Sequence, residues 1–443
     1  MQLTIEKLVY GGDGLARLEQ ADGKRKTVFV PLVLPGETVE VTLVEERPGF
    51  ARAKLESVVE PSPSRTASPC PYFGECGGCH YQHAPYEKQL ELKSSVLRET
   101  VSRIAKVDLP EITLHASPPL HYRNRTRMRL VATPSGESKF VIGYNRLASH
   151  RVLPVRECPI SSPLINRALQ GIWSIAATHE APAGLAEIEF FADSTDEKLQ
   201  LEFLTETSAD DSTLRAFARE IADAAPAIAG ISRIPRPRRE HNDTTSAPEL
   251  DTDITVRATA LAGRPDLTYD IAEYKYRVSA GSFFQTNRHL TSKLIELVTN
   301  GANGKRALDL YAGVGLFTLP LAKSFERVTS VESAASSFRD LVANAPANVK
   351  PIESTTEAFL QKLSGSKPDF VVADPPRSGL GKRVTAALVK LQPREVACVS
   401  CDPSTLARDL PALLAAGYRI REAHLVDLFP QTFHIETVLR LVR

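Results

Sequence analysis

The chain has 443 residues and nearly equal numbers of basic and acidic side chains, with a formal net charge of +1, so no global basic field indicates a nucleic-acid partner. Glycines and charges interrupt residues 1–20, which excludes a signal peptide, and no apolar run reaches the ~18–20 residues of a membrane span. Six cysteines are too few for a secreted disulfide framework. We expect a cytoplasmic monomer of roughly two to four domains with no membrane partner.

The first 59 residues alternate short β-type runs with glycine and proline turns. The runs are residues 3–9, 27–31, 37–44 and 52–58, with turn signals at 11–14 and 35–36. Short strands that close on themselves predict a small β-barrel, and five-stranded barrels of this size commonly bind oligonucleotides. A purely structural β domain explains the pattern equally well.

A linker rich in proline and serine, residues 60–69, leads into a cysteine-rich segment. Cys70, Cys76 and Cys79 lie within ten residues of one another, and Cys158 offers a fourth thiolate. The glycines between Cys76 and Cys79 allow the backbone to wrap closely round an inorganic centre. Four thiolates suit zinc or an iron–sulfur cluster, and the spacing and the Cys158-Pro159 pair favour [4Fe–4S]. His80 and His83 leave a Cys/His zinc site open as the alternative.

Residues 85–105 are predicted to form a helix, because apolar side chains recur on one side among charged ones. An arginine then occupies every second position at Arg123, Arg125, Arg127 and Arg129. Alternate residues of a strand share a face, so we expect a row of guanidiniums without acidic partners, suited to binding phosphates. A solvated strand face is the alternative. Residues 235–253 have the composition of a mobile polar loop.

From about residue 280 the pattern changes to alternating strands and helices, which predict a Rossmann-like, doubly wound α/β sheet. The predicted strands are 306–311, 328–331, 370–373 and 396–399. Side chains that could bind a ligand or react, such as Glu332, Asp374 and Cys401, lie at or just after the carboxyl ends of these strands. Ligands of such sheets bind at these carboxyl ends. We therefore expect a binding site there.

A glycine turn containing Gly313 and Gly315 follows the first of these strands, and Glu332 ends the second. This arrangement fits a nucleoside cofactor whose ribose hydroxyls bind the carboxylate. Thr318 stands where a dinucleotide fingerprint has Gly or Ala, which favours S-adenosylmethionine over NAD. A tight turn without a ligand is the alternative.

Cys401 lies in the segment SCDP, after an apolar strand and before a helix-type segment. A thiol at a strand-to-helix turn is well placed to be a nucleophile, because backbone N–H groups at a helix start favour the thiolate. The alternative is a buried apolar cysteine, which is our interpretation of Cys398. Structural packing is also our interpretation of His434.

Five segments together resemble the RNA uracil-C5 methyltransferases. They are SFFQTN at 282–287, DLYAGVG at 309–315, DPPR at 374–377, SCDP at 400–403 and DLFPQTFHIE at 427–436. The first 58 residues are similar to a TRAM domain, and the cysteines resemble the [4Fe–4S] site of the ribosomal-RNA branch. The resemblance implies a TRAM-like barrel (1–59), an iron–sulfur and central α+β RNA-binding domain (60–265) and a methyltransferase domain (266–443).

The resemblance also implies residue roles. Cys401 would be the nucleophile, and Glu436 would be the base that removes the C5 proton. The residues implied to contact S-adenosylmethionine are Gln285, Tyr311, Gly313, Glu332 and Asp374. The residues implied to hold the cluster are Cys70, Cys76, Cys79 and Cys158. The implied substrate is a uridine of 23S ribosomal RNA, with transfer RNA or a non-catalytic iron–sulfur RNA-binding protein as alternatives. Leu316 departs from the asparagine that is common in the family.

Overall fold

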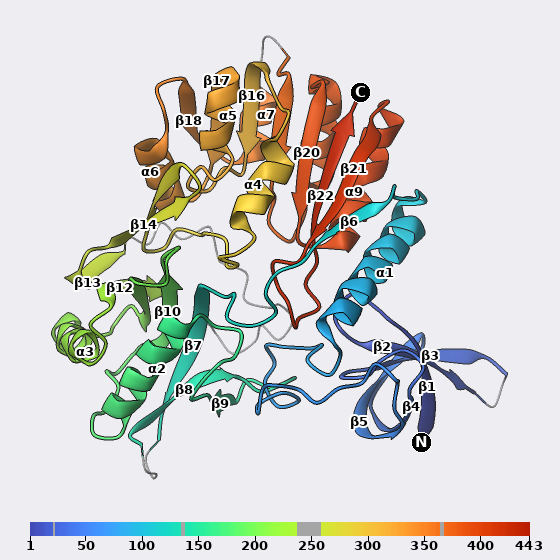
Figure 1. The fold of residues 1–443 in the computed structure, drawn as a ribbon, viewed down its shortest axis with the longest axis vertical. Helices are drawn as coiled ribbons and strands as arrows, with labels where there is room; N and C mark the ends of the chain where they lie inside the picture. The colour runs from blue at the N-terminus through green and yellow to red at the C-terminus, as the bar shows by residue number, and fades with distance from the viewer. Residues whose placement is uncertain (21–22, 134–137, 237–257, 364–366) are drawn as a thin grey trace.

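The computed structural model describes residues 1–20, 23–133, 138–236, 258–363 and 367–443. Residues 237–253 of the predicted polar loop lie outside this range. The chain forms three regions: an N-terminal barrel, a central sheet with two helices, and a large C-terminal α/β sheet (Figure 1). None of the described helices is long and apolar enough to cross a membrane.

The N-terminal region is a closed barrel of five strands, which confirms the predicted fold. Their order is β1-β2-β3-β5-β4. The strands are β1 (Gln2–Leu8), β2 (Gly14–Glu19), β3 (Arg25–Val30), β4 (Thr38–Glu46) and β5 (Phe50–Glu60). Alternate side chains of β1 and β4 point inward, and ten small or branched apolar residues fill the barrel. β2 was not predicted, because it starts inside the glycine-rich turn.

The central region contains a seven-stranded sheet in the order β13-β12-β11-β10-β7-β8-β9. The strands are β7 (Arg125–Ala132), β8 (Phe140–Asn145), β9 (Val152–Pro154), β10 (Leu185–Ala192), β11 (Leu199–Glu206), β12 (Ile228–Arg236) and β13 (Thr259–Gly263). Two amphipathic helices, α2 (Pro163–Ala176) and α3 (Asp211–Ala224), pack their apolar sides on this sheet. The opposite face of the central sheet lies toward the C-terminal region, where Arg125 contacts Ser282.

The C-terminal region is an eight-stranded sheet in the order β18-β17-β16-β19-β20-β22-β21-β6. Its strands are β16 (Gly304–Leu310), β17 (Phe325–Glu332), β18 (Val349–Glu353), β19 (Phe370–Ala373), β20 (Glu395–Ser400), β21 (Arg419–Val426), β22 (Glu436–Val442) and β6 (Ile112–His115). The four predicted strands are found, with ends that differ by at most three residues from those predicted. β22 runs antiparallel between β20 and β21, and the other neighbouring strands are parallel.

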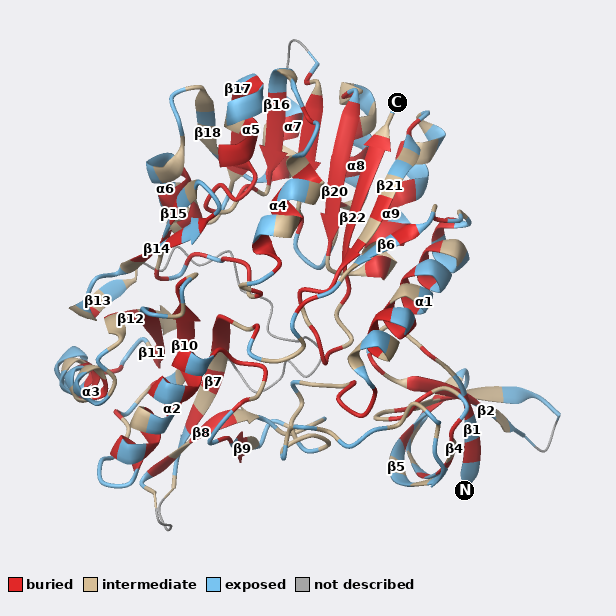
Figure 2. Ribbon diagram, viewed as in Figure 1, coloured by how far each residue is buried: buried red, intermediate tan, exposed pale blue. Residues whose placement is uncertain are grey.

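Helices cover both faces of this sheet, so its strands are buried (Figure 2). The helices are α1 (Tyr86–Ala105), α4 (Thr291–Thr299), α5 (Thr318–Ser324), α6 (Ala335–Asn344), α7 (Thr356–Lys362), α8 (Gly381–Leu391) and α9 (Pro403–Ala415). A hairpin of β14 (Asp266–Ile271) and β15 (Tyr274–Ser279) packs on the same face as α4 and α5.

The predicted helix at 85–105 is confirmed as α1, and it belongs structurally to the C-terminal sheet. Leu97 and Val101 of α1 share a core with Leu406 and Leu410 of α9. The strand that follows, β6, pairs in parallel with β21 at the sheet edge. A segment early in the chain therefore completes the C-terminal α/β region.

Candidate active site and cysteine cavity

The Cys401 turn joins β20 to α9 at the carboxyl edge of the sheet. Asp402 caps α9, its Oδ1 accepting from the N–H groups of Ser404 at 2.7 Å and Thr405 at 3.2 Å, and Pro403 opens the helix. The Ser400 hydroxyl donates to the Asp402 carbonyl at 3.0 Å. These contacts form a tight turn in which Cys401 is half-buried, whereas Cys398 is 4% exposed and belongs to the core, as predicted.

The environment of Cys401 does not favour its thiolate in the free protein. Burial, followed by the negative charges of Glu436 and Asp374, raises the pKa of the Cys401 thiol to about 12. The expected effect of the helix start is therefore outweighed, because the first N–H groups of α9 are bound by Asp402 and not by sulfur. In the free protein the raised pKa favours the protonated form of Cys401.

Glu436 stands beside this turn because of strand register. It is the first residue of β22, and the next residue, Thr437, pairs with Ser400 of β20. Glu436 is 5% exposed, and burial together with the charge of Asp374 raises its pKa well above the usual range. Burial also raises the pKa of Asp374 to about 7. The two carboxyl groups interact and resist simultaneous ionisation.

The glycine turn after β16 carries the features of a nucleoside site. Tyr311 has φ +63°, a conformation that is strained for an aromatic residue, and Gly313 and Gly315 also have positive φ. The Gly313 N–H donates to Glu332 Oε2 at 2.7 Å, which holds this carboxylate at the end of β17 facing the turn. Its other oxygen accepts from the N–H groups of Ser333 and Ala334.

A buried acid lies beneath this turn. Asp309 is completely buried, and burial raises its pKa to about 7. Its Oδ2 accepts a 2.6 Å hydrogen bond from Thr318, and Oδ1 has no partner among the described residues. Thr318, which breaks the dinucleotide fingerprint, is thus used to bind this acid. Asp309 was not predicted as a site residue, although it opens the DLYAGVG motif.

The segment 282–287 is held from two regions. Arg125 of the central sheet donates to the Ser282 carbonyl at 2.6 Å, and Asp340 of α6 accepts from the Ser282 hydroxyl at 2.7 Å. Asn287 donates to the Leu428 carbonyl at 3.1 Å, which ties this segment to the 427–436 segment. Gln285 is 8% exposed within it, and its contact with a cofactor stays a prediction.

The segment 427–435, which leads into Glu436, is held by residues from early in the chain. The His80 and Tyr81 N–H groups both donate to the Gln431 carbonyl, at 2.8 and 3.0 Å. The Tyr122 hydroxyl donates to the Pro430 carbonyl at 3.0 Å. These partners lie next to Cys79 and to Arg123, so the cysteine segment is in direct contact with the segment that leads into Glu436.

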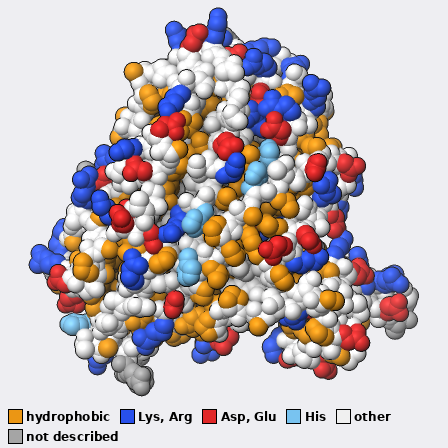
Figure 3. All heavy atoms as spheres, viewed as in Figure 1, with side chains coloured by type: hydrophobic (Ala, Val, Ile, Leu, Met, Phe, Trp, Pro, Cys, Tyr) orange, Lys and Arg blue, Asp and Glu red, His pale blue; other side chains and the backbone are white. Residues whose placement is uncertain are grey.

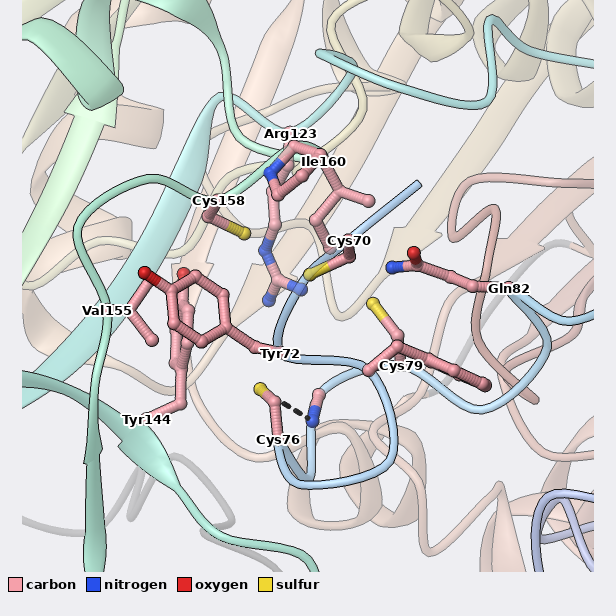
Figure 4. A pocket seen from close by; sticks show the side chains of 13 residues that line it. Cys70, Tyr72, Cys76, Cys79, Gln82, Arg123, Tyr144, Val155, Cys158 and Ile160 are labelled. Carbon is pink, nitrogen blue, oxygen red and sulfur yellow. Dashed lines mark hydrogen bonds between the residues drawn. The ribbon is translucent and has the colours of Figure 1, made fainter. Parts of the chain in front are cut away.

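The four predicted cluster cysteines line one cavity, although Cys158 is far from the others in sequence (Figure 4). Their sulfur atoms point into a common space, and the Arg123 side chain extends into it. Cys76 Sγ accepts from the Gly78 N–H at 3.4 Å. No group of three or more His, Cys, Asp or Glu side chains in the described ranges is arranged to hold a single metal ion.

The two histidines of the zinc alternative do not line this cavity. His80 packs edge-on against Phe433 with ring centroids 4.6 Å apart, and His83 stacks on Phe73 at 5.5 Å. Burial lowers the pKa of both imidazoles to about 4. His434 also packs against an aromatic ring, that of Phe433 at 4.3 Å, as its structural interpretation predicted.

The predicted row of four unpaired arginines is wrong. Arg123 precedes β7 and points into the cysteine cavity. Arg125 is buried between Glu189 and Glu202, and Arg127 donates to Glu189 at 2.7 Å. Arg129 bonds neutral oxygens, the Asn145 side chain at 3.0 Å and the His150 carbonyl at 2.8 Å. Of these four, Arg129 is the arginine within β7 that has no acidic partner among the described residues. On the face in Figure 3, Lys and Arg side chains lie around much of the margin.

Comparison with known proteins agrees with this arrangement. The model of the tRNA (Uracil-5-)-methyltransferase family matches residues 85–443, and the TRAM domain model matches residues 1–55. The chain belongs to the tRNA (uracil-5-)-methyltransferase family. The methyltransferase is 32% identical to an RNA methyltransferase of Aquifex aeolicus, over 100% of this chain and 98% of the relative.

Two further relatives bear on the RNA that is modified. The chain is 32% identical to a 23S rRNA (uracil(1939)-C(5))-methyltransferase of Halomonas elongata, over 99% of this chain and 89% of that protein. The solved tRNA (uracil-54, C5)-methyltransferase of Pyrococcus abyssi superposes over 100% of both chains with a TM-score of 0.73 and 24% identity. The latter likeness supports the fold. The methyltransferase is an RNA uracil-C5 enzyme that uses S-adenosylmethionine.

Proposed function

We propose that this methyltransferase modifies a uridine of 23S ribosomal RNA at C5, through a covalent bond between Cys401 and C6 of the uracil. The register of β20 and β22, which sets Glu436 beside the Cys401 turn, carries the proposal because the reaction needs a thiol and a base at one carbon–carbon bond. The relatives of Halomonas elongata and Pectobacterium atrosepticum, named as 23S rRNA enzymes, support the choice of RNA.

The chemistry requires covalent help because C5 of uracil is a weak nucleophile. Cys401 loses its thiol proton to solvent and its thiolate adds to C6, so that the electrons of the C5–C6 double bond move to the C4 carbonyl as an enolate. C5 then takes the methyl group, and the donor leaves as a neutral thioether. Glu436 removes the C5 proton, which restores the double bond and expels the Cys401 thiolate. General-base help of this kind is typically worth ~10²–10⁴-fold.

When bound, S-adenosylmethionine supplies a methyl group on a positively charged sulfur. The acids at the carboxyl edge fit a cation, since Asp374, Glu436 and Asp309 all have raised pKa values in the free protein. A positive charge near them favours their ionised forms. Gly313 and Glu332 would hold the ribose, and Tyr311 and Gln285 would complete this side of the site.

We further propose that the cysteine cavity holds a [4Fe–4S] cluster. A cluster fits the observation that four sulfurs surround a hollow rather than a single point, whereas zinc draws four sulfurs to ~2.3 Å from one ion. The four cysteine thiolates would hold the iron and sulfide of the cluster. Together the thiolates and the cluster would carry a negative charge. Arg123 then offers a compensating charge in the same cavity.

The test of the RNA target is incubation of the purified protein with labelled S-adenosylmethionine and either unmodified 23S ribosomal RNA or unmodified transfer RNA. We expect 5-methyluridine in the ribosomal RNA, at one position when the product is mapped by mass spectrometry. Modification of transfer RNA alone would contradict the choice. Transfer RNA is the second candidate because the archaeal structure that superposes over the full chain is named for it.

A further inference from the structure

The barrel touches the catalytic turn directly. The Tyr10 hydroxyl, in the turn between β1 and β2, donates a 3.0 Å hydrogen bond to the backbone carbonyl of Cys401. The Tyr10 ring meets Phe433 edge-on, with centroids 5.6 Å apart and planes at 88°. Phe433 lies three residues before Glu436. One side chain of the barrel therefore contacts the segments that carry both proposed catalytic groups.

The barrel turn is shaped for this close approach. The Val9 N–H donates to the Asp13 carbonyl at 2.9 Å and the Gly12 N–H to the Val9 carbonyl at 3.2 Å, which closes the turn behind Tyr10. Gly12 has φ +94°, and a Cβ there would lie 3.3 Å from the His80 side chain. A side chain at Gly12 would be strained at this φ and would crowd His80. The turn thus fits against the cysteine segment as well as the catalytic edge.

The hydrogen bond from Tyr10 differs from the others that define the Cys401 turn. Ser400 and Asp402, which shape the turn, belong to the same strand–helix unit as Cys401. Among the described residues, Tyr10 is the hydrogen-bond partner that reaches this turn from another region. Burial and the nearby Asp402 raise the pKa of Tyr10, so its hydroxyl remains a donor throughout the neutral range.

We propose that Tyr10 is a positioning residue for the nucleophile, so that the N-terminal barrel completes the active site as well as contacting RNA. The bond to the Cys401 carbonyl fixes the peptide that carries the sulfur, and a fixed thiol loses less freedom when it attacks C6. The proposal rests on the proposed nucleophilic role of Cys401. It goes beyond RNA binding, because it assigns part of the barrel's contribution to the chemical step.

The full-length protein is compared with its Y10F, Y10A and C401A variants. Y10F keeps the ring against Phe433 and removes only the hydroxyl. The matched control is Y418F, which removes a 2.7 Å hydroxyl-to-carbonyl bond to Pro393, near the opposite end of β20. The measurements are kcat and KM for RNA, the rate of adduct formation with 5-fluorouridine RNA, and the thermal midpoint.

We expect Y10F to lower kcat and the adduct rate about tenfold, with KM changed less than about twofold and the thermal midpoint almost unchanged. Y10A lowers kcat further, and Y418F leaves kcat near that of the parent protein. A normal kcat with a raised KM in Y10F would overturn the proposal, since it would indicate RNA binding alone. A kcat loss that only follows a loss of thermal stability would also overturn it.

The variant C401A separates this proposal from the proposed function. Activity that survives in C401A refutes the nucleophile, and with it the reason for positioning that residue. An inactive C401A together with a fully active Y10F refutes the role of Tyr10 and leaves the proposed function intact.

Discussion

Lys93 and Asp427 form an ion pair with both side chains completely buried, the Nζ and Oδ1 atoms lying 2.6 Å apart. Lys93 lies in α1, and Asp427 begins the segment that leads to Glu436. The Lys93 ammonium group also donates to the Phe429 carbonyl at 2.9 Å. The pair therefore joins α1 to the segment that leads into Glu436.

We predict that K93M destabilises the protein by about 3–5 kcal/mol, because it leaves the Asp427 carboxylate buried without its partner. The change is measured as the free energy of unfolding in urea. The matched control is K88M, which breaks the exposed pair with Glu91 on the same helix and is expected to cost less than about 1 kcal/mol. Equal effects of the two variants would contradict this account of α1.

The proposed role of Glu436 as the base predicts how the rate depends on pH. Because this pKa is raised, the carboxyl group is protonated at low pH and gains its basic form only as the pH rises. The Cys401 thiolate also becomes more abundant with rising pH. We predict that the single-turnover rate continues to rise with pH above the usual range of glutamate, with no plateau in that range.

The variant D374N tests the cause of this shift. It removes a negative charge that raises the pKa of both Glu436 and Cys401. We expect the pH profile to move to lower pH, together with a higher KM for S-adenosylmethionine if Asp374 binds it. A profile that stays in place, or moves to higher pH, would show that the two carboxyl groups do not interact as described.

Removal of the proposed base, Glu436, is predicted to trap the covalent intermediate. In E436Q the Cys401 thiol can still add to C6 and the methyl group can still be transferred, but no base takes the C5 proton. We expect a covalent protein–RNA complex to accumulate with ordinary uridine RNA, and turnover to fall by at least about 100-fold. The complex is detected as a slow band in a denaturing gel. Wild-type turnover in E436Q would assign the base elsewhere.

If the cysteine cavity holds the proposed cluster, loss of iron is expected to destabilise the segment that leads into Glu436. C79S should lower bound iron and the visible absorbance of the purified protein, and should lower the thermal midpoint, because the next two N–H groups hold Gln431. The control is C398A, which removes a thiol outside the cavity and should retain full iron. Stoichiometric zinc in place of iron in the parent protein would contradict the cluster.

Local patterns were sufficient for much of the fold. The barrel and the strands that end near Tyr311, Glu332, Asp374 and Cys401 were predicted because their turns and apolar runs are contiguous in sequence. The position of β6 beside β21 was not predictable, because a strand far from its neighbours carries no local sign of its partner. For the same reason the contact of Tyr10 with the active site was missed.

The arginine row shows where local reasoning failed. The segment itself contains no acid, which suggested unpaired guanidiniums. Its acidic partners come from other strands of the sheet: the register pairs Arg127 with Glu189, and Glu202 lies on the strand beyond. Only the sheet order shows that Arg125 is a buried structural residue.

We therefore predict that R129A weakens RNA binding about uniformly across sequences, whereas R125M destabilises the fold.

The most direct test of the account is the site of covalent attachment to RNA. The protein is incubated with S-adenosylmethionine and target RNA containing 5-fluorouridine. In this nucleotide a fluorine replaces the C5 hydrogen, so the base has no C5 proton to remove and the covalent complex persists. The complex is then digested and the linked peptide identified by mass spectrometry. We predict one nucleotide linked to the peptide that contains Cys401, and none in C401A. A link at another residue, or methylation of ordinary RNA by C401A, would contradict the central claim.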